Sequence, residues 1–154
     1  MGEVKKIESF IVDHDKIEPG IYISRTDGDL ITYDIRTRKP NAGKYMDNIT
    51  MHTVEHMFAT YVRNSDIGNK VIYFGPMGCQ TGFYLIVKDT QPQKVLETVK
   101  SVLAQIINHK GEVFGASRKE CGNYKNLSLE PCIEECKNYL EVLNSKTEVD
   151  FKYE

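Results

Sequence analysis

Hydrophobic and polar residues alternate in the first third of the chain and recur at helical spacing further on. Residues 20–26 and 29–36 are rich in isoleucine and tyrosine, and Asp27-Gly28 joins them. A short turn of this type between two alternating runs predicts a β-hairpin. From Met51 onward, apolar residues recur every three or four positions, which indicates an amphipathic helix that ends near Asn64-Ser65. Three residues before or within its first turn are plausible N-caps: Asp47, Asn48 and Thr50.

The second half of the chain continues this mixed pattern. Residues 71–74 and 83–88 resemble two buried strands on either side of the glycine-rich turn at 75–82. Pro92 opens a second helix with one apolar stripe, which Gly111 is expected to end. Ser128 and Pro131 begin a third helix. About four strands and three main helices in this order predict an α+β fold, with a sheet that carries helices on one face.

Composition restricts the class of protein. The 154 residues include 20 basic and 22 acidic side chains, for a net charge of −2, and 40% of the residues are hydrophobic. This composition is ordinary for one globular domain, which we expect to span residues 1–154, and gives no sign of a nucleic-acid or polybasic membrane footprint. No apolar run reaches the ~18–20 residues of a membrane span, and no secretory signal precedes the domain. We therefore expect a cytoplasmic protein, whose four cysteines are free thiols, metal ligands or nucleophiles.

The strongest local motif is His52-Thr53-Val54-Glu55-His56. Residues four apart share one face of a helix, so the two imidazoles can bind one divalent ion. Glu55 lies at the edge of that face, where its carboxylate can act on a metal-bound group without being a ligand. The order H-x-x-E-H is the reverse of the zincin motif. The alternative is a surface helix with two solvated histidines and an incidental glutamate.

A catalytic metal ion needs a third protein ligand and one open position. The candidates are the four cysteines, the other two histidines and many acidic residues. Cys121 lies in a polar, basic segment, where Arg118 and Lys119 favour the thiolate that a metal requires, and we take it as the third ligand. Cys132 and Cys136 are spaced four apart on the third predicted helix, so they are expected to be structural thiols packed beneath it.

Cys79 has different surroundings, because it lies in the glycine-rich turn at the end of a strand. Exposed backbone amides and nearby cations stabilise a thiolate, and such a cysteine can act as a general base or a nucleophile. The alternative is that a small residue is needed there because the turn is crowded.

Several motifs, in order, closely resemble the S-ribosylhomocysteine lyase (LuxS) family, the bacterial enzymes of autoinducer-2 synthesis. They are E-S-F-I-V-D-H at 8–14, Y-D-I-R at 33–36 with Pro40-Asn41 after it, H-T-V-E-H-M-F-A at 52–59, G-P-M-G-C-Q-T-G at 75–82 and K-E-C-G at 119–122. The resemblance runs from about residue 5 to 140. Residues 73–75, Tyr-Phe-Gly, depart from the Asp-Ile-Ser of many members, which affects the expected substrate contacts there.

The resemblance implies a site and an assembly. His52, His56 and Cys121 would bind one divalent metal per subunit, Fe²⁺ natively, with Zn²⁺ or Co²⁺ able to substitute. Cys79 and Glu55 would be the acid/base pair. Arg36 would hold Cys79 ionised and, with Ser9 and His14, would line the substrate pocket. The implied fold is a LuxS-like metalloenzyme with a small antiparallel sheet backed by helices, assembled as a homodimer whose active sites draw on both chains.

The implied reaction converts S-ribosylhomocysteine to homocysteine and 4,5-dihydroxy-2,3-pentanedione by carbonyl migration and β-elimination. It would serve autoinducer synthesis in quorum sensing, the methyl cycle, or both. Two other hypotheses remain open on the residues alone. One is an inverzincin-type zinc metallopeptidase, which shares H-x-x-E-H, and the other is a small structural-metal or metal-sensing module.

Overall fold

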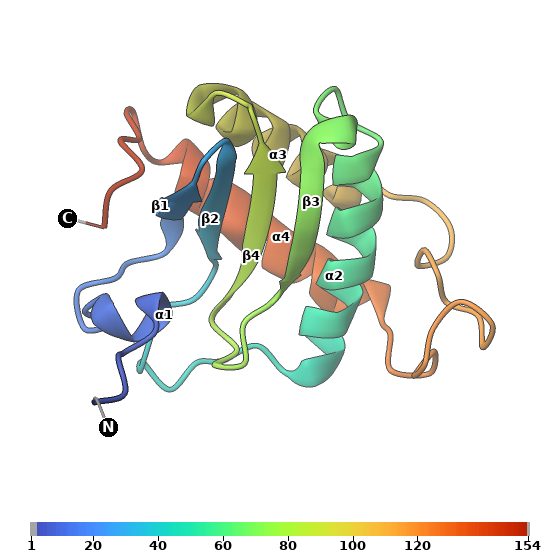
Figure 1. Ribbon diagram of the computed structural model, residues 1–154. Coiled ribbons are helices and arrows are strands. Elements are labelled where there is room, and N and C mark those ends of the chain that lie inside the picture. Colours follow the sequence, from blue (N-terminus) through green and yellow to red (C-terminus); the bar gives the residue numbers. More distant parts are fainter. Residues whose placement is uncertain (1–2, 154) are drawn as a thin grey trace.

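The computed structural model describes residues 3–153 and has one layer of sheet and one layer of helices (Figure 1). The four strands pair antiparallel in the order β1-β2-β4-β3. They are β1 (Gly20–Asp27), β2 (Leu30–Arg36), β3 (Val71–Pro76) and β4 (Gly82–Lys88). The helices are α1 (Glu8–Ile11), α2 (Asn48–Arg63), the 3-10 turn η1 (Gly68–Lys70), α3 (Pro92–Ile107) and α4 (Leu129–Asn144). Because α2, α3 and α4 all cover the same face, the predicted α+β architecture is confirmed.

The start of α2 agrees with one of the predicted N-caps, whereas the end of α3 and the presence of α1 differ from the prediction. Helix α2 begins three residues before Met51, because the Asp47 side chain accepts a hydrogen bond from the Thr50 amide at 2.8 Å and caps the helix. Helix α3 ends at Ile107, well before Gly111, since the Asn108 side chain donates to the Ala104 carbonyl at 2.9 Å and ends the helix there. Helix α1 was not predicted, because four residues are too short to show a helical period.

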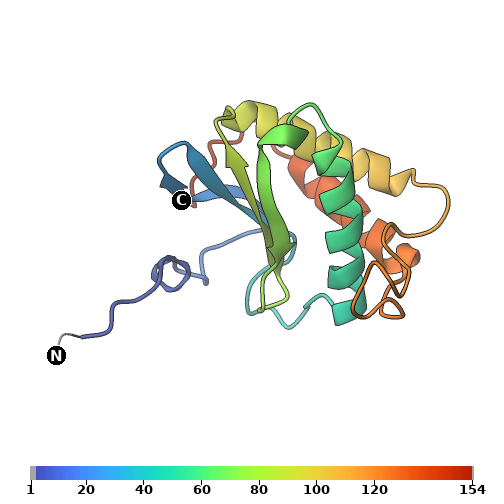
Figure 2. The same ribbon diagram turned by 45° about the vertical axis from the view of Figure 1, so that its right-hand side comes forward.

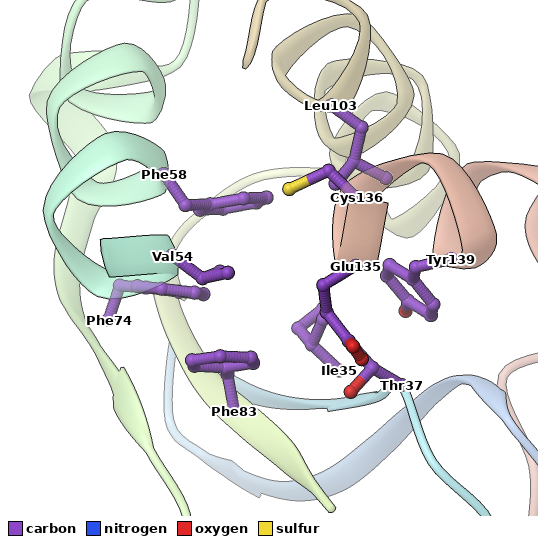
Figure 3. Close-up of a pocket in the computed structure, with 10 residues that line it drawn as sticks. All are labelled: Ile35, Thr37, Val54, Phe58, Phe74, Phe83, Leu103, Glu135, Cys136 and Tyr139. Atoms are coloured by element: carbon purple, nitrogen blue, oxygen red, sulfur yellow. The ribbon is translucent and has the colours of Figure 1, made fainter. Parts of the chain in front are cut away.

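The hydrophobic core lies between the sheet and the three long helices. Phe74 is the middle ring of an aromatic stack, 4.3 Å from Phe58 of α2 and 5.1 Å from Phe83 of β4 between ring centroids. Beside these rings a cavity of about 10 Å³ remains, roughly the space of a single water molecule (Figure 3). At one end of that cavity the Glu135 carboxylate lies beside Thr37, so a polar group borders the core.

Within residues 3–153 the other face of the sheet carries no long helix, and the N-terminal segment projects away on that side (Figure 2). The C-terminal segment closes the exposed edge of β1, where the Ile23 amide donates to the Phe151 carbonyl at 2.8 Å. Phe151 packs edge-on to Tyr33 in the core, and Tyr153 stacks on Tyr22 at 4.9 Å. An edge strand is thus covered by a segment of the same chain.

No helix in the described part of the chain combines the length and the apolar character needed to cross a bilayer.

Candidate metal centre and catalytic site

The structure brings His52, His56 and Cys121 together. Both histidines lie on one face of α2, and Cys121 comes from the long loop between α3 and α4 that passes beside this helix (Figure 1). One potential ligand atom from each residue lies within 4.8 Å of the other two. The Cys121 sulfur is 3.4 Å from His52 Nε2, and the two imidazole rings are nearly perpendicular at 87°. The four-residue spacing on a helix predicts only that the two histidines lie together. The structure adds the position of Cys121 beside them.

Backbone carbonyls fix the proton positions on both imidazoles. His52 Nδ1 is 2.8 Å from the Asn126 carbonyl, and His56 Nδ1 is 2.8 Å from the Phe114 carbonyl. A carbonyl only accepts, so each Nδ1 donates and each Nε2 keeps a free lone pair for a metal. The Asn123 amide donates to the Cys121 sulfur at 3.3 Å, which fixes the orientation of that sulfur. The three groups are therefore oriented as ligands.

The loop between α3 and α4 supplies these carbonyls and is held against α2 at several points. Gly115 has a φ of +68°, and a Cβ there would lie 3.1 Å from His56 Nδ1, so a side chain would press on a ligand. The Thr53 hydroxyl accepts a hydrogen bond from the Ser128 amide at 2.9 Å, which fixes the end of the loop. The sequence pattern gave no signal for Phe114 or Asn126, because they contribute backbone atoms, which any residue type carries.

The donor set fits a soft or borderline divalent ion. Two imidazole nitrogens and one thiolate suit Fe²⁺, Co²⁺ or Zn²⁺ and disfavour Mg²⁺ and Ca²⁺, which prefer oxygen. Three protein ligands leave a position for substrate or water, as in catalytic rather than structural sites.

Glu55 lines an open cavity of about 250 Å³ next to the histidine pair. Its carboxylate makes no hydrogen bond or ion pair within residues 3–153, so both oxygens are free to take a proton. Pro76 at the end of β3 lines the same cavity, three residues before Cys79. The other lining residues are Asn48, Met51, His52, Asn123 and Asn126.

Cys79 is exposed in the tight turn between β3 and β4. The turn is closed by hydrogen bonds from the Met77 amide to the Gly82 carbonyl and from the Gln80 amide to the Met77 carbonyl. Arg36 Nη1 lies 4.0 Å from the Cys79 sulfur, close enough for charge attraction but long for a hydrogen bond. The nearest side-chain partner of the sulfur is the Thr81 hydroxyl at 3.0 Å, a residue that the sequence analysis did not single out.

Arg36 is a buried cation with a fixed orientation. Only 2% of it is exposed, and its Nε and Nη2 donate to the two oxygens of Asp34 at 3.0 and 2.6 Å. Burial lowers the pKa of the Arg36 guanidinium, but the hydrogen bonds and charge of Asp34 outweigh burial and raise that pKa above its ordinary value. Tyr153 donates to the second Asp34 oxygen at 2.9 Å. Arg36 therefore stays charged at every working pH.

Ser9 and His14 do not line the cavity of their own chain beside His52. Ser9 lies on α1 and faces a shallow pocket on the open face of the sheet, next to Tyr73 and Tyr84. His14 Nδ1 bonds the Val12 carbonyl at 2.9 Å. Cys132 and Cys136 are buried under α4, as expected of structural thiols.

The Tyr73 ring lies over Gly75 in the 73–75 segment. A Cβ on Gly75 would clash with the Tyr73 hydroxyl, so a larger residue there would require the exposed tyrosine side chain to move.

Comparisons with known proteins agree with this site. The family model described as S-Ribosylhomocysteinase (LuxS) matches residues 7–150. A protein of Borreliella burgdorferi named S-ribosylhomocysteine lyase is 43% identical over 97% of this chain and 99% of its own length. Proteins with the same name from Finegoldia magna and Desulfotalea psychrophila are 44% and 39% identical, over 92% and 97% of this chain and 94% and 99% of their own lengths.

Proposed function

The chain belongs to the S-ribosylhomocysteinase (LuxS) family and is a carbon–sulfur lyase, and we propose that its reaction requires one divalent metal ion held by His52, His56 and Cys121. The convergence of these three ligand atoms within 4.8 Å, with both Nε2 lone pairs free, is the observation that carries this proposal. The metallopeptidase alternative gains no support, because the relatives are named as lyases.

The substrate's own chemistry sets what the site must do. S-ribosylhomocysteine has a thioether on C5, and no neighbouring proton is acidic while the carbonyl is at C1. Two carbonyl shifts, to C2 and then to C3, make the C4 proton acidic and the sulfur a β leaving group. Removal of that proton then breaks the C5–S bond, and homocysteine leaves with the electron pair. Tautomerisation of the remaining enol gives 4,5-dihydroxy-2,3-pentanedione.

We assign the proton transfers to two residues of this chain. The Cys79 thiolate takes the proton from the carbon next to the carbonyl and returns it to the former carbonyl carbon, in each of the two shifts. Glu55 moves the hydroxyl protons between neighbouring oxygens and assists the final elimination; its unpaired carboxylate supports that role. A divalent ion at the three ligands would supply Lewis acidity, on the order of several kcal/mol of charge stabilisation. Arg36 contributes a permanent positive charge beside Cys79.

Homocysteine release, measured as free thiol, tests these assignments. Cys79→Ala and Cys79→Ser are expected to lower kcat by about 10²- to 10⁴-fold, the usual range for losing a general acid or base. Glu55→Gln should retain the metal but lose turnover, because the amide has the size of the carboxylate without its basicity. Near-normal turnover in Cys79→Ala would remove the cysteine from the mechanism, and loss of metal from Glu55→Gln would make Glu55 structural.

We propose Fe²⁺ as the native ion, with Zn²⁺ or Co²⁺ able to replace it, because a thiolate with two imidazoles suits all three. Metal analysis of protein purified without oxygen tests this. A Cys121→Ser variant is the matched control and is expected to lose most of the bound metal.

We further propose a cytoplasmic homodimer in which Ser9, His14 and Arg36 contribute to substrate binding, with Ser9 and His14 supplied across the interface. Four apolar side chains of the N-terminal segment are largely exposed, which is typical of a surface that a partner covers. They are Val4, Ile7, Phe10 and Ile11. The four free cysteines fit a reducing compartment.

Mixing two inactive variants tests the shared site. In a mixed dimer of His14→Ala and Cys79→Ala chains, one of the two sites would combine an intact His14 with an intact Cys79. Recovery of activity on mixing is expected, and sedimentation should give the mass of two chains. No recovery in a demonstrated mixed dimer would mean that each site is built from one chain.

A further inference from the structure

The Thr81 hydroxyl lies between the two groups whose charges matter in the cysteine turn. Its oxygen is 2.8 Å from Arg36 Nη1 and 3.0 Å from the Cys79 sulfur, whereas the guanidinium itself is 4.0 Å from that sulfur. Two contacts of normal hydrogen-bond length therefore connect the guanidinium to the thiol through this hydroxyl, whereas the direct contact is long for a hydrogen bond.

The chemistry of the three groups sets the direction of both hydrogen bonds when Cys79 is a thiolate. A guanidinium has donors and no acceptor, so the Thr81 oxygen must accept from Arg36. The hydroxyl has one proton, and the Cys79 sulfur is its other close partner. A thiolate has no proton to donate, so in that state the Thr81 hydroxyl donates to the sulfur, and a hydrogen bond to an ionised group is stronger than one to a neutral group.

The position of Thr81 is fixed by contacts that leave its hydroxyl free for this role. The side chain is 2% exposed, so water does not compete for the hydroxyl. The Thr81 carbonyl accepts from the Thr37 and Arg38 amides at 3.0 and 2.9 Å, which ties the turn to the chain after β2. Arg36 is itself held by Asp34. The hydroxyl is thus preorganised by its own burial and by the fixed position of Arg36.

We propose that Thr81 is the positioning residue for Cys79: its hydroxyl donates to the sulfur, fixes the orientation of the thiolate and transmits the charge of Arg36 to it. This inference rests on the proposed role of Cys79 as the base of the lyase reaction, but the hydrogen bond itself can be tested without turnover.

Alkylation by iodoacetamide reports the thiolate directly. Trypsin is expected to release residues 71–88 as one peptide, in which Cys79 is the only cysteine, so mass spectrometry separates it from Cys121, Cys132 and Cys136. In the metal-loaded protein, Thr81→Val removes the hydroxyl and keeps the shape, and Thr81→Ser keeps the hydroxyl. The pH of half-maximal alkylation is expected to rise by about one unit in Thr81→Val, a tenfold loss of thiolate at a given pH. It should stay within ~0.3 units of wild type in Thr81→Ser.

Turnover supplies a second readout that packing alone would not move. In Thr81→Val the acid limb of the kcat profile should shift by the same amount as alkylation, with KM within about twofold of wild type. Should Thr81→Val fold poorly, Thr81→Ala offers a second hydroxyl-free variant with room to relax. An unchanged alkylation profile in the folded hydroxyl-free variant would overturn the proposal, and so would an equal shift in Thr81→Ser. A retained turnover in Cys79→Ala would instead overturn only the proposed role of Cys79.

Discussion

The ion pair between Arg38 and Glu135 offers the sharpest stability test in this fold. Glu135 on α4 is 4% exposed; Arg38 Nε donates to its Oε1 at 3.0 Å and to its Oε2 at 2.9 Å, and Nη2 donates to Oε1. The Arg38 side chain remains 31% exposed. Replacing Arg38 by Met keeps an unbranched apolar stem, removes the guanidinium and leaves the buried carboxylate without this cation.

Removing one partner of a buried pair typically costs ~3–5 kcal/mol of unfolding free energy. The exposure of Arg38 lets water reach the carboxylate from one side, so the lower end, about 3 kcal/mol, is expected. For a chain of this length each kcal/mol shifts the melting temperature by ~2–4 °C, which gives a decrease of about 6–12 °C. The double variant Arg38→Met/Glu135→Met removes both charges and should recover at least ~2 kcal/mol of that loss.

Urea unfolding of wild type, both single variants and the double variant closes a double-mutant cycle. Single-variant losses below ~1 kcal/mol, or additive losses in the double variant, would refute the view that the carboxylate depends on Arg38. Measuring turnover in the same variants separates an effect on stability from an effect on the catalytic site. The backbone hydrogen bond from the Arg38 amide to the Thr81 carbonyl is retained in every variant.

Three further outcomes follow from single side chains. Asp47→Ala should cost about 1 kcal/mol of unfolding free energy at pH 7 by uncapping α2. Hydrogen bonds from the Thr50 side chain and amide lower the pKa of Asp47, so the stability difference should persist above pH 3.8, the ordinary pKa, and shrink as the pH falls through the lower folded-state pKa. Acid titration of the stability of both proteins checks this. Burial raises the pKa of Tyr33 to about 12, and its hydroxyl has no hydrogen-bond partner within residues 3–153. Tyr33→Phe should therefore be neutral or stabilising by ~1 kcal/mol in urea unfolding. A clear loss of stability would reveal a hydrogen-bond partner. Tyr153→Phe should cost about 1 kcal/mol in melting experiments, because it removes a donor to Asp34, and an unchanged melting temperature would contradict that contact.

Periodicity in the sequence was sufficient for the architecture and for two of the three ligands. The hairpin turn at Asp27-Gly28 and the apolar stripes predicted the strands and long helices closely, since burial imposes a period on each. The four-residue spacing of His52 and His56 required only that a helix form there. Asp47 was among the predicted N-caps of α2 and is the observed one, but the end of α3 was not predicted, because the side-chain hydrogen bond of Asn108 ends that helix before Gly111.

The remaining site contacts have no sequence signature of their own. Cys121 was selected by its basic neighbours, but its approach to α2 depends on how a loop without regular structure folds. Thr81 was overlooked because a threonine in a glycine-rich turn is ordinary, and its importance comes only from the two groups it contacts. Ser9 and His14 were assigned by resemblance, and their role stays a prediction.

The placement of Cys121, 69 residues beyond His52, has a thermodynamic consequence. An ion shared by the two residues acts as a crosslink that reduces the number of conformations accessible to the unfolded chain. A crosslink that closes a longer segment of chain excludes more of these conformations. Ion binding and unfolding would then be linked equilibria, so that a higher affinity for the ion gives a higher free energy of unfolding. Chelation should accordingly make the segment between α3 and α4 susceptible to limited proteolysis before the sheet opens, and restoring the ion should protect it again.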